Sequence, residues 1–213
     1  DKNPSEALAR LIWLSRVPSG YAPIYGEIGR NLAKAFEKTK DTKWASQAMA
    51  YLLHAARLNP MDYEYYYELA RCNYVLGQYL KASGIMETAA SYAQSAIRCA
   101  PGYVFSYLLL SDIYLFKKDY AKAESCYREL ASSSEKETRS YGWTSLALVP
   151  VYQGKFETAL KILDDGIAAD RMEQFETDMT AYKHFQKAFL LYESQKKMSL
   201  ALKEAEIGME IYR

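Results

Sequence analysis

A short pattern recurs along this 213-residue chain at intervals of a few tens of residues. Each copy combines a polar break, an aromatic residue and an alanine that opens the next helical segment. The clearest copies are Gly77-Gln-Tyr-Leu-Lys-Ala82, Lys118-Asp-Tyr-Ala-Lys-Ala123 and Gly154-Lys-Phe-Glu-Thr-Ala159, and weaker copies end at Ala48 and Ala201. Repeats of this length are typical of solenoids, in which each unit stacks on the one before it.

The alanines and the breaks between them predict paired helices. Alanine recurs at 48, 82, 123, 159 and 201, at spacings of 34, 41, 36 and 42 residues. A small side chain at each position predicts a close helix crossing, which a larger residue would force apart. Gly77 and Gly154 are expected at turns between paired helices. Pro60 and Pro101 are expected to end the helices before them.

Composition agrees with a helical solenoid and narrows the classes of function. Half of the residues are hydrophobic and a quarter are charged, which is enough to bury a core, and the 20 tyrosines suit half-buried positions between helices. A formal net charge of +1 gives no electrostatic reason to bind nucleic acid or anionic lipid. The longest apolar stretch, residues 103–116, contains Asp112 and is shorter than the roughly 18 to 20 residues of a membrane span. We therefore expect no membrane insertion.

The units resemble the tetratricopeptide repeat (TPR) family over roughly residues 24–212. In the third unit the residues at the family's positions are Tyr107, Leu110, Ser111, Tyr114, Ala123 and Tyr127. In the fourth they are Trp143, Leu146, Ala147, Ala159, Leu163 and Gly166. The second unit matches at Tyr66, Leu69, Ala70, Ala82 and Ala89, and the fifth at Phe185, Ala188, Phe189, Tyr192 and Ala201. Pro150 lies in the first helix of the fourth unit and is expected to kink it.

This resemblance implies an all-α fold, a right-handed superhelical solenoid of antiparallel helix pairs. We expect residues 1–213 to form a single TPR-like repeat domain, with about five helix-pair units over 23–213 and a partial or capping unit over 1–22. The stretch from Ser5 to Val17 is expected to be the second helix of a truncated unit. The chain begins Asp-Lys-Asn-Pro without a methionine, which indicates a processed protein or a piece of a longer one.

The first helix of every unit is expected to line a concave groove. Its exposed side recurs at about i, i+3, i+7 and i+10. The predicted groove residues are Glu64, Tyr67, Arg71 and Tyr74 in the second unit, Phe105, Leu108, Asp112 and Leu115 in the third, and Tyr141, Thr144, Leu148 and Val151 in the fourth. This mostly aromatic and aliphatic surface suits an apolar peptide or helix with a few polar anchors. The sequence thus predicts a protein-interaction scaffold whose partner is a protein or peptide.

Several alternatives stay open. The chain itself can cover the groove, by superhelical closure or a capping helix, and Arg71 and Asp112 can form a structural ion pair. The chain can also be a TPR regulatory or sensory segment of a larger multidomain protein. A binder of a small apolar ligand would instead have a closed pocket around Phe105, Leu108 and Tyr141.

One partner known for this kind of repeat is not expected. Some TPR proteins hold the carboxylate end of chaperone tails with lysines, asparagines and an arginine on their first helices. The corresponding positions here lack those donors: Ala33, Glu37, Tyr67, Phe105 and Leu109.

Local signatures of catalysis are missing from the sequence. It contains no phosphate-binding glycine loop, nucleophile elbow, His-Glu-x-x-His motif or calcium loop. His54 and His184 are expected to be packed or surface residues rather than ligands. The three cysteines, Cys72, Cys99 and Cys126, have no metal-ligand spacing, and their odd number favours a reducing compartment such as the cytoplasm. We expect no enzyme activity, no metal and no cofactor.

Overall fold

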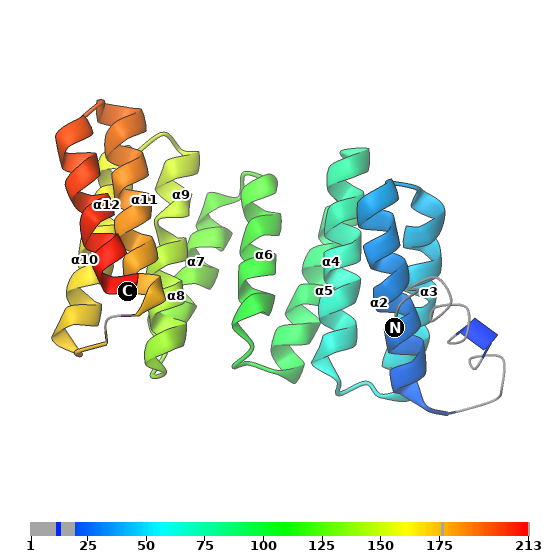
Figure 1. The fold of residues 1–213 in the computed structure, drawn as a ribbon. Helices are drawn as coiled ribbons and strands as arrows, with labels where there is room; N and C mark the ends of the chain where they lie inside the picture. The colour runs from blue at the N-terminus through cyan, green and yellow to red at the C-terminus, as the bar shows by residue number, and fades with distance from the viewer. Residues whose placement is uncertain (1–11, 14–19, 176, 213) are drawn as a thin grey trace. The chain divides into compact units, whose positions relative to one another are not determined.

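The computed structural model describes residues 12–13, 20–175 and 177–212, and the secondary structure in these ranges is helical (Figure 1). Its helices are α2 (Ala22–Thr39), α3 (Thr42–Leu58), α4 (Tyr63–Leu80), α5 (Ser83–Cys99), α6 (Val104–Phe116), α7 (Tyr120–Ala131), α8 (Lys136–Leu146), α9 (Leu148–Tyr152), α10 (Phe156–Met172), α11 (Asp178–Gln195) and α12 (Met198–Tyr212). The all-α prediction is confirmed. None of these helices is both long and apolar enough to cross a lipid bilayer.

Short polar residues begin several helices, and lysines end several others. Asp41 and Asp62 each accept a hydrogen bond from a backbone N–H in the first turn of the helix that follows, which satisfies a donor with no partner inside that helix. Lys40, Lys81 and Lys196 are C-caps with φ of 59°, 52° and 52°. A cation is favoured at this end of a helix because the dipole there is negative. These caps keep the connections between helices short.

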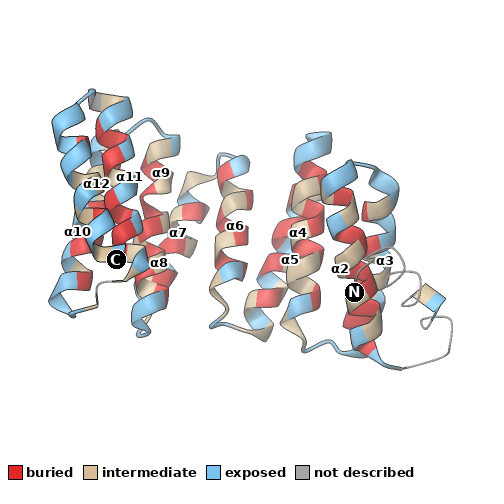
Figure 2. Ribbon diagram, viewed as in Figure 1, coloured by how far each residue is buried: buried red, intermediate tan, exposed pale blue. Residues whose placement is uncertain are grey.

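The chain divides into two compact units, residues 1–113 and 114–213, and each is described by itself. In unit 1, α2 packs on α3, α4 packs on α5, and α3 also contacts α4. The buried side chains of this unit lie on the facing sides of the helices (Figure 2). One cluster joins Leu32 and Phe36 of α2, Ala45 and Ala48 of α3, and Leu76 of α4. The core is therefore shared between successive helix pairs.

Unit 2 is built from α7 to α12. Helix α10 packs against α8, α9 and α11, and α12 packs against α11. Helices α8 and α11 run in the same direction (Figure 1) and contact each other. Gly142 allows α7 and α8 to meet closely, since a Cβ there would lie 2.1 Å from the backbone nitrogen of Ala131. The antiparallel helix pairs and the parallel first helices of a solenoid are both present in this unit.

The alanine register is right in the later units and wrong in the second. Ala123, Ala159 and Ala201 are buried at the fourth position of α7, α10 and α12. Ala82, in contrast, lies before α5 as its N-cap, and the fourth helical residue is Met86. Met86 fits there because Gly77 lies opposite, where a Cβ would come within 3.1 Å of the Met86 side chain.

Other predicted breaks have mixed outcomes. Gly77 does not form a turn: α4 continues through it, and Lys81 provides the left-handed residue instead. Gly154 does lie in a turn, with φ of +72°. The interruption expected from Pro150 is present, as α8 ends at Leu146 and α9 begins at Leu148. Because proline has no amide hydrogen, it cannot donate to the carbonyl four residues earlier.

Most of the opening stretch, Ser5 to Val17, lies outside the described residues. Within it, Ile12 packs against the Leu32 cluster of unit 1. The single-domain organisation over 1–213 and the partial unit over 1–22 stay predictions.

We predict that Ala123→Leu destabilises the protein by about 1 to 3 kcal/mol, because the added carbons overpack a fully buried helix crossing. Chemical denaturation measures the change. Ala121→Leu is the matched control, since Ala121 is exposed on the same helix and its replacement should be nearly neutral. Equal stability of the two variants would contradict the close crossing.

Candidate functional site

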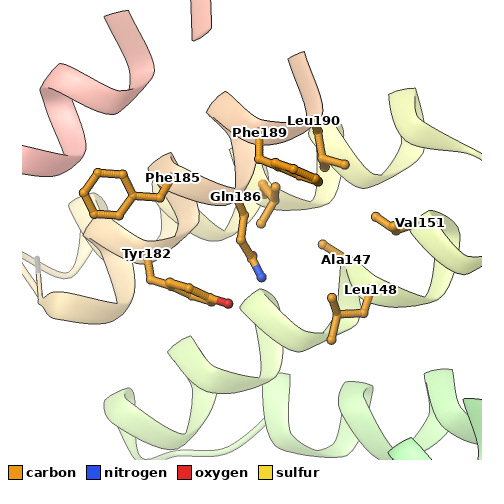
Figure 3. Close-up of a pocket in the computed structure, with 9 residues that line it drawn as sticks. Ala147, Leu148, Val151, Tyr182, Phe185, Gln186, Phe189 and Leu190 are labelled. Atoms are coloured by element: carbon orange, nitrogen blue, oxygen red, sulfur yellow. The ribbon is translucent and has the colours of Figure 1, made fainter. Parts of the chain in front are cut away.

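An apolar hollow lies within unit 2, between α8/α9 and α11 (Figure 3). We call it the unit 2 cleft; its volume is about 320 Å³, and it is lined by Ala147, Leu148, Val151, Leu163, Tyr182, Phe185, Gln186, Phe189 and Leu190. None of the nine lining side chains carries a charge. Buried Leu163 and Leu190 belong to the hydrophobic core and form the floor. The hydrophobic core of unit 2 is therefore open to solvent at the cleft.

Four aromatic side chains follow the exposed side of α11. Tyr182, Phe185, Phe189 and Tyr192, here called the α11 stripe, have exposed fractions of 50%, 37%, 64% and 41%. Their spacing, i, i+3, i+7 and i+10, is the same as in the predicted groove of the preceding units, but the register differs. The predicted groove begins 18 residues before the buried alanine of the second helix, at Phe105 and Tyr141, and the same offset from Ala201 gives residue 183 rather than Tyr182. The groove register therefore does not predict the α11 stripe, and Phe185, Phe189 and Tyr192 resemble the family's own positions instead.

Gln186 is the polar residue at the centre of the cleft. Its side-chain amide points from α11 towards the space beside Tyr182 (Figure 3). The Oε1 atom is inaccessible to solvent and has no hydrogen-bond partner within the described residues. Leaving a buried acceptor unpaired costs about 1 to 3 kcal/mol.

A buried ion pair holds α11 against α10 and α8. The Nζ atom of Lys183 has no exposed surface and donates to Asp170 Oδ2 of α10 at 2.6 Å and to Ser140 Oγ of α8 at 2.7 Å. Thr180 Oγ1 also donates to Asp170 Oδ2, at 2.6 Å. Burial lowers the pKa of the Lys183 ammonium, although the hydrogen bond and charge of Asp170 oppose that shift. The cluster ties α8, α10 and α11 together.

A second charged cluster fixes α12 to α11. Glu204 of α12 lies 2.7 Å from His184 Nδ1 and 2.8 Å from Lys187 Nζ, and Lys187 also pairs with Asp164 of α10 at 2.6 Å. Burial acts to raise the pKa of Glu204, but hydrogen bonds and charges from Lys187 and His184 outweigh burial and lower it. His184 is thus a packed residue with an acidic partner. His54 is exposed and meets the Tyr25 ring edge-on at 4.3 Å.

In unit 1, two of the predicted anchors are engaged in ion pairs between α2 and α4. Glu64 pairs with Arg30 at 2.8 Å, and Arg71 pairs with Glu37 and Glu68. Partial burial acts to lower the pKa of Arg71, but the two glutamates outweigh it and raise the pKa. Arg71 therefore takes part in a structural ion pair, but with Glu37 across to α2; the pair with Asp112 considered from the sequence stays a prediction.

The remaining predicted residues of unit 1 include an aromatic group. The ring of Tyr103 lies 5.5 Å from Tyr67 and 5.5 Å from Phe105, and Phe105 is about half exposed. Tyr74, Leu108 and Asp112 are half-buried.

Two predicted groove residues are buried in the structure. Leu115 is 5% exposed and Thr144 is 3% exposed, and Thr144 donates its hydroxyl to the Ser140 carbonyl at 2.8 Å. Tyr141 and Leu148 are half-buried, and Leu148 and Val151 line the unit 2 cleft. Binding by any of the predicted residues stays a prediction.

The described ranges contain side chains of the types that bind metal ions or act as nucleophiles. They contain no group of three or more His, Cys, Asp or Glu side chains arranged to hold a metal ion. Burial raises the pKa of the Cys72 thiol to about 12, so it is protonated at neutral pH. Ser140 and Lys183 are adjacent, as in a nucleophile and base, but both are buried away from any substrate.

Several solved structures share this arrangement of helices. MamA from Desulfovibrio magneticus RS-1 matches with a TM-score of 0.54 at 15% identity, over 88% of this chain and 94% of that one. PilF from Pseudomonas aeruginosa matches with a TM-score of 0.57 at 16% identity, over 90% of this chain and 78% of that one. YrrB, described as a TPR protein with an unusual peptide-binding site, matches with a TM-score of 0.52 at 12% identity, over 94% and 91%.

These likenesses define the class of the fold: the chain is an all-α helical solenoid of the tetratricopeptide type. The resemblance seen in the sequence is confirmed at this level. No protein-family model matches the sequence, and no curated protein matches it as a relative.

We predict that Lys183→Met destabilises the protein by about 3 to 5 kcal/mol, because it leaves the Asp170 carboxylate buried without its counter-charge. The double variant Asp170→Asn/Lys183→Met should recover most of that loss, since both charges are then removed. Urea denaturation of the three proteins measures this. A single variant no less stable than the double would show that the pair is not coupled.

Proposed function

We propose that this chain is a protein-interaction scaffold that takes up an apolar segment of a partner protein in the unit 2 cleft. The observation that carries the proposal is the α11 stripe. Its four aromatic side chains are partly exposed, and three of them, Tyr182, Phe185 and Phe189, line an apolar hollow of about 320 Å³. Contiguous exposed apolar surface is uncommon on soluble proteins unless it binds something.

The form of the surface supports a peptide or helix as occupant. Phe189 and Tyr192 extend the apolar surface along α11, and Phe189 is almost two-thirds exposed. A side chain of a partner can enter the hollow while its neighbours cover these rings. Aromatic residues are enriched among interface positions that contribute most to affinity. A small apolar ligand, the alternative occupant, would leave much of the stripe in water.

The other predicted groove residues belong to the same proposal. Tyr141 and Leu148 lie beside the cleft on α8 and α9, while Tyr67, Tyr74, Phe105 and Leu108 offer partly exposed apolar surface in unit 1. Glu64, Arg71 and Asp112 add polar groups there. YrrB, which has the same type of fold, is described as having a peptide-binding site. The role of a regulatory segment within a larger protein would use the same surfaces.

We predict that Phe189→Asp weakens peptide binding at least about tenfold while leaving the fold intact, because the new carboxylate replaces an exposed ring and stays solvated. Peptides are first selected from a random displayed library on the immobilised full chain. They are then resynthesised, and affinities are measured by fluorescence anisotropy.

Tyr79→Asp is the matched control, since Tyr79 is an aromatic residue on α4 that is 52% exposed and lies off the predicted groove. Circular dichroism checks the fold of both variants. Equal loss in both variants, or no selected peptide at all, would overturn the proposal. Displacement of a bound apolar dye without any selected peptide would favour the small-ligand alternative.

A further inference from the structure

A second hollow lies beside the same two helices, α8 and α11. It has a volume of about 530 Å³ and is lined by Glu137, Tyr141, Phe175, Thr177, Asp178 and Met179. We call it the acidic hollow. Tyr141 lies seven residues before Leu148 on the α8/α9 side, and Met179 lies seven residues before Gln186 on α11. Because α8 and α11 run in the same direction (Figure 1) and contact each other, the two hollows lie at successive positions along the same pair of helices, and we call the two together the trough.

The chemistry of the trough changes from one end to the other. The unit 2 cleft has no charged lining residue, whereas the acidic hollow has two exposed carboxylates, Glu137 and Asp178, beside two aromatic rings. Within residues 20–175 and 177–212 neither carboxylate forms an ion pair. Carboxylates next to aromatic rings favour a cation, by direct attraction and by the negative face of the ring.

The nearest basic residues are engaged with Glu173 rather than with these two carboxylates. Lys136 Nζ donates to the Glu173 carbonyl at 3.1 Å, and Arg139 pairs with the Glu173 carboxylate. Lys136 also lies 5.8 Å from the centre of the Phe175 ring, so one aromatic wall of the hollow already accepts an ammonium group.

Helix dipoles explain part of this arrangement but not all of it. Glu137 and Asp178 lie in the first turns of α8 and α11, where negative charge stabilises a helix. That effect accounts for an acidic residue at each position. It does not account for an aromatic-lined hollow between the two, placed in line with the apolar cleft.

We infer that the partner segment carries a lysine or arginine for the acidic hollow, about 10 Å from an aromatic or large aliphatic side chain for the unit 2 cleft. The spacing follows from seven helical residues at about 1.5 Å each. On a helical partner the two side chains are seven residues apart; on an extended partner they are three apart. This inference rests on the proposed function and specifies the chemistry of its partner.

The test is a peptide selection from a random displayed library on three forms of the full chain. These are the wild type, Glu137→Gln/Asp178→Asn, and the control Glu157→Gln/Asp165→Asn, which removes two exposed carboxylates from α10. The wild type and the control should enrich peptides with a basic residue three or seven positions from an aromatic or large aliphatic one. The Glu137→Gln/Asp178→Asn form should keep the apolar preference and lose the basic one.

Affinity measurements on a resynthesised peptide give the second readout. We expect about tenfold weaker binding to Glu137→Gln/Asp178→Asn at low salt, and a smaller difference at high salt because ions screen exposed charges. Apolar peptides without a basic preference, or a basic preference that survives in this variant, would overturn the inference and leave the proposed function standing. Failure to enrich any peptide would overturn both.

Discussion

Close approach of paired helices is the constraint on which the rest of the structure depends. Fully buried Ala123 and Ala159 sit at the fourth positions of α7 and α10, where larger side chains would hold the helices apart. Where that position is occupied by Met86, the missing volume is on the partner helix, at Gly77. The helix crossing thus limits the summed volume of the two facing side chains rather than the volume of either one. This explains how degenerate repeats can keep one architecture.

The unit 2 cleft needs a more specific restraint than packing volume. Small facing residues allow helices to slide or rotate, because an apolar interface has no direction. Lys183, Asp170 and Ser140 supply directional bonds from α11 to α10 and α8. Burying such a pair brings little net stability. Its effect here is to set the rotation of α11, and with Lys183 facing inward, Tyr182, Phe185 and Phe189 face outward above the cleft.

The sequence is sufficient to predict helix pairs, because their signal is local: polar breaks, capping residues and small residues recur at similar spacing. It misplaces the second unit because Ala82 continues the alanine pattern, whereas the position that matters holds Met86. The space for Met86 comes from Gly77 on the facing helix, so neither helix alone carries a sequence pattern that reveals it. The predicted groove ended with Val151, and its register carried to the fifth unit begins at residue 183, so it does not give the α11 stripe that begins at Tyr182.

Other features of the site could not be predicted from local pattern. Lys183 is separated in the sequence by 13 residues from Asp170 and by 43 residues from Ser140. No feature of the residues around them identifies the three as partners. The burial of Thr144 depends on the face that α8 turns to its neighbours, and Ala147 interrupts the helix only three residues later. Pro150 predicts that the helix is interrupted, but it does not predict the direction in which the chain continues after the break.

The two ends of the trough would contribute differently to recognition. An apolar cleft gives affinity without direction, since any large hydrophobic side chain gains from leaving water. Carboxylates such as Glu137 and Asp178 add little net affinity at an exposed site but favour one charge and one position. Because the two hollows lie along the same parallel helices, a short partner segment would have to present its two side chains at a fixed spacing. Specificity would then come from the distance between the hollows, which α8 and α11 maintain because Lys183 of α11 donates to Ser140 of α8 as well as to Asp170 of α10.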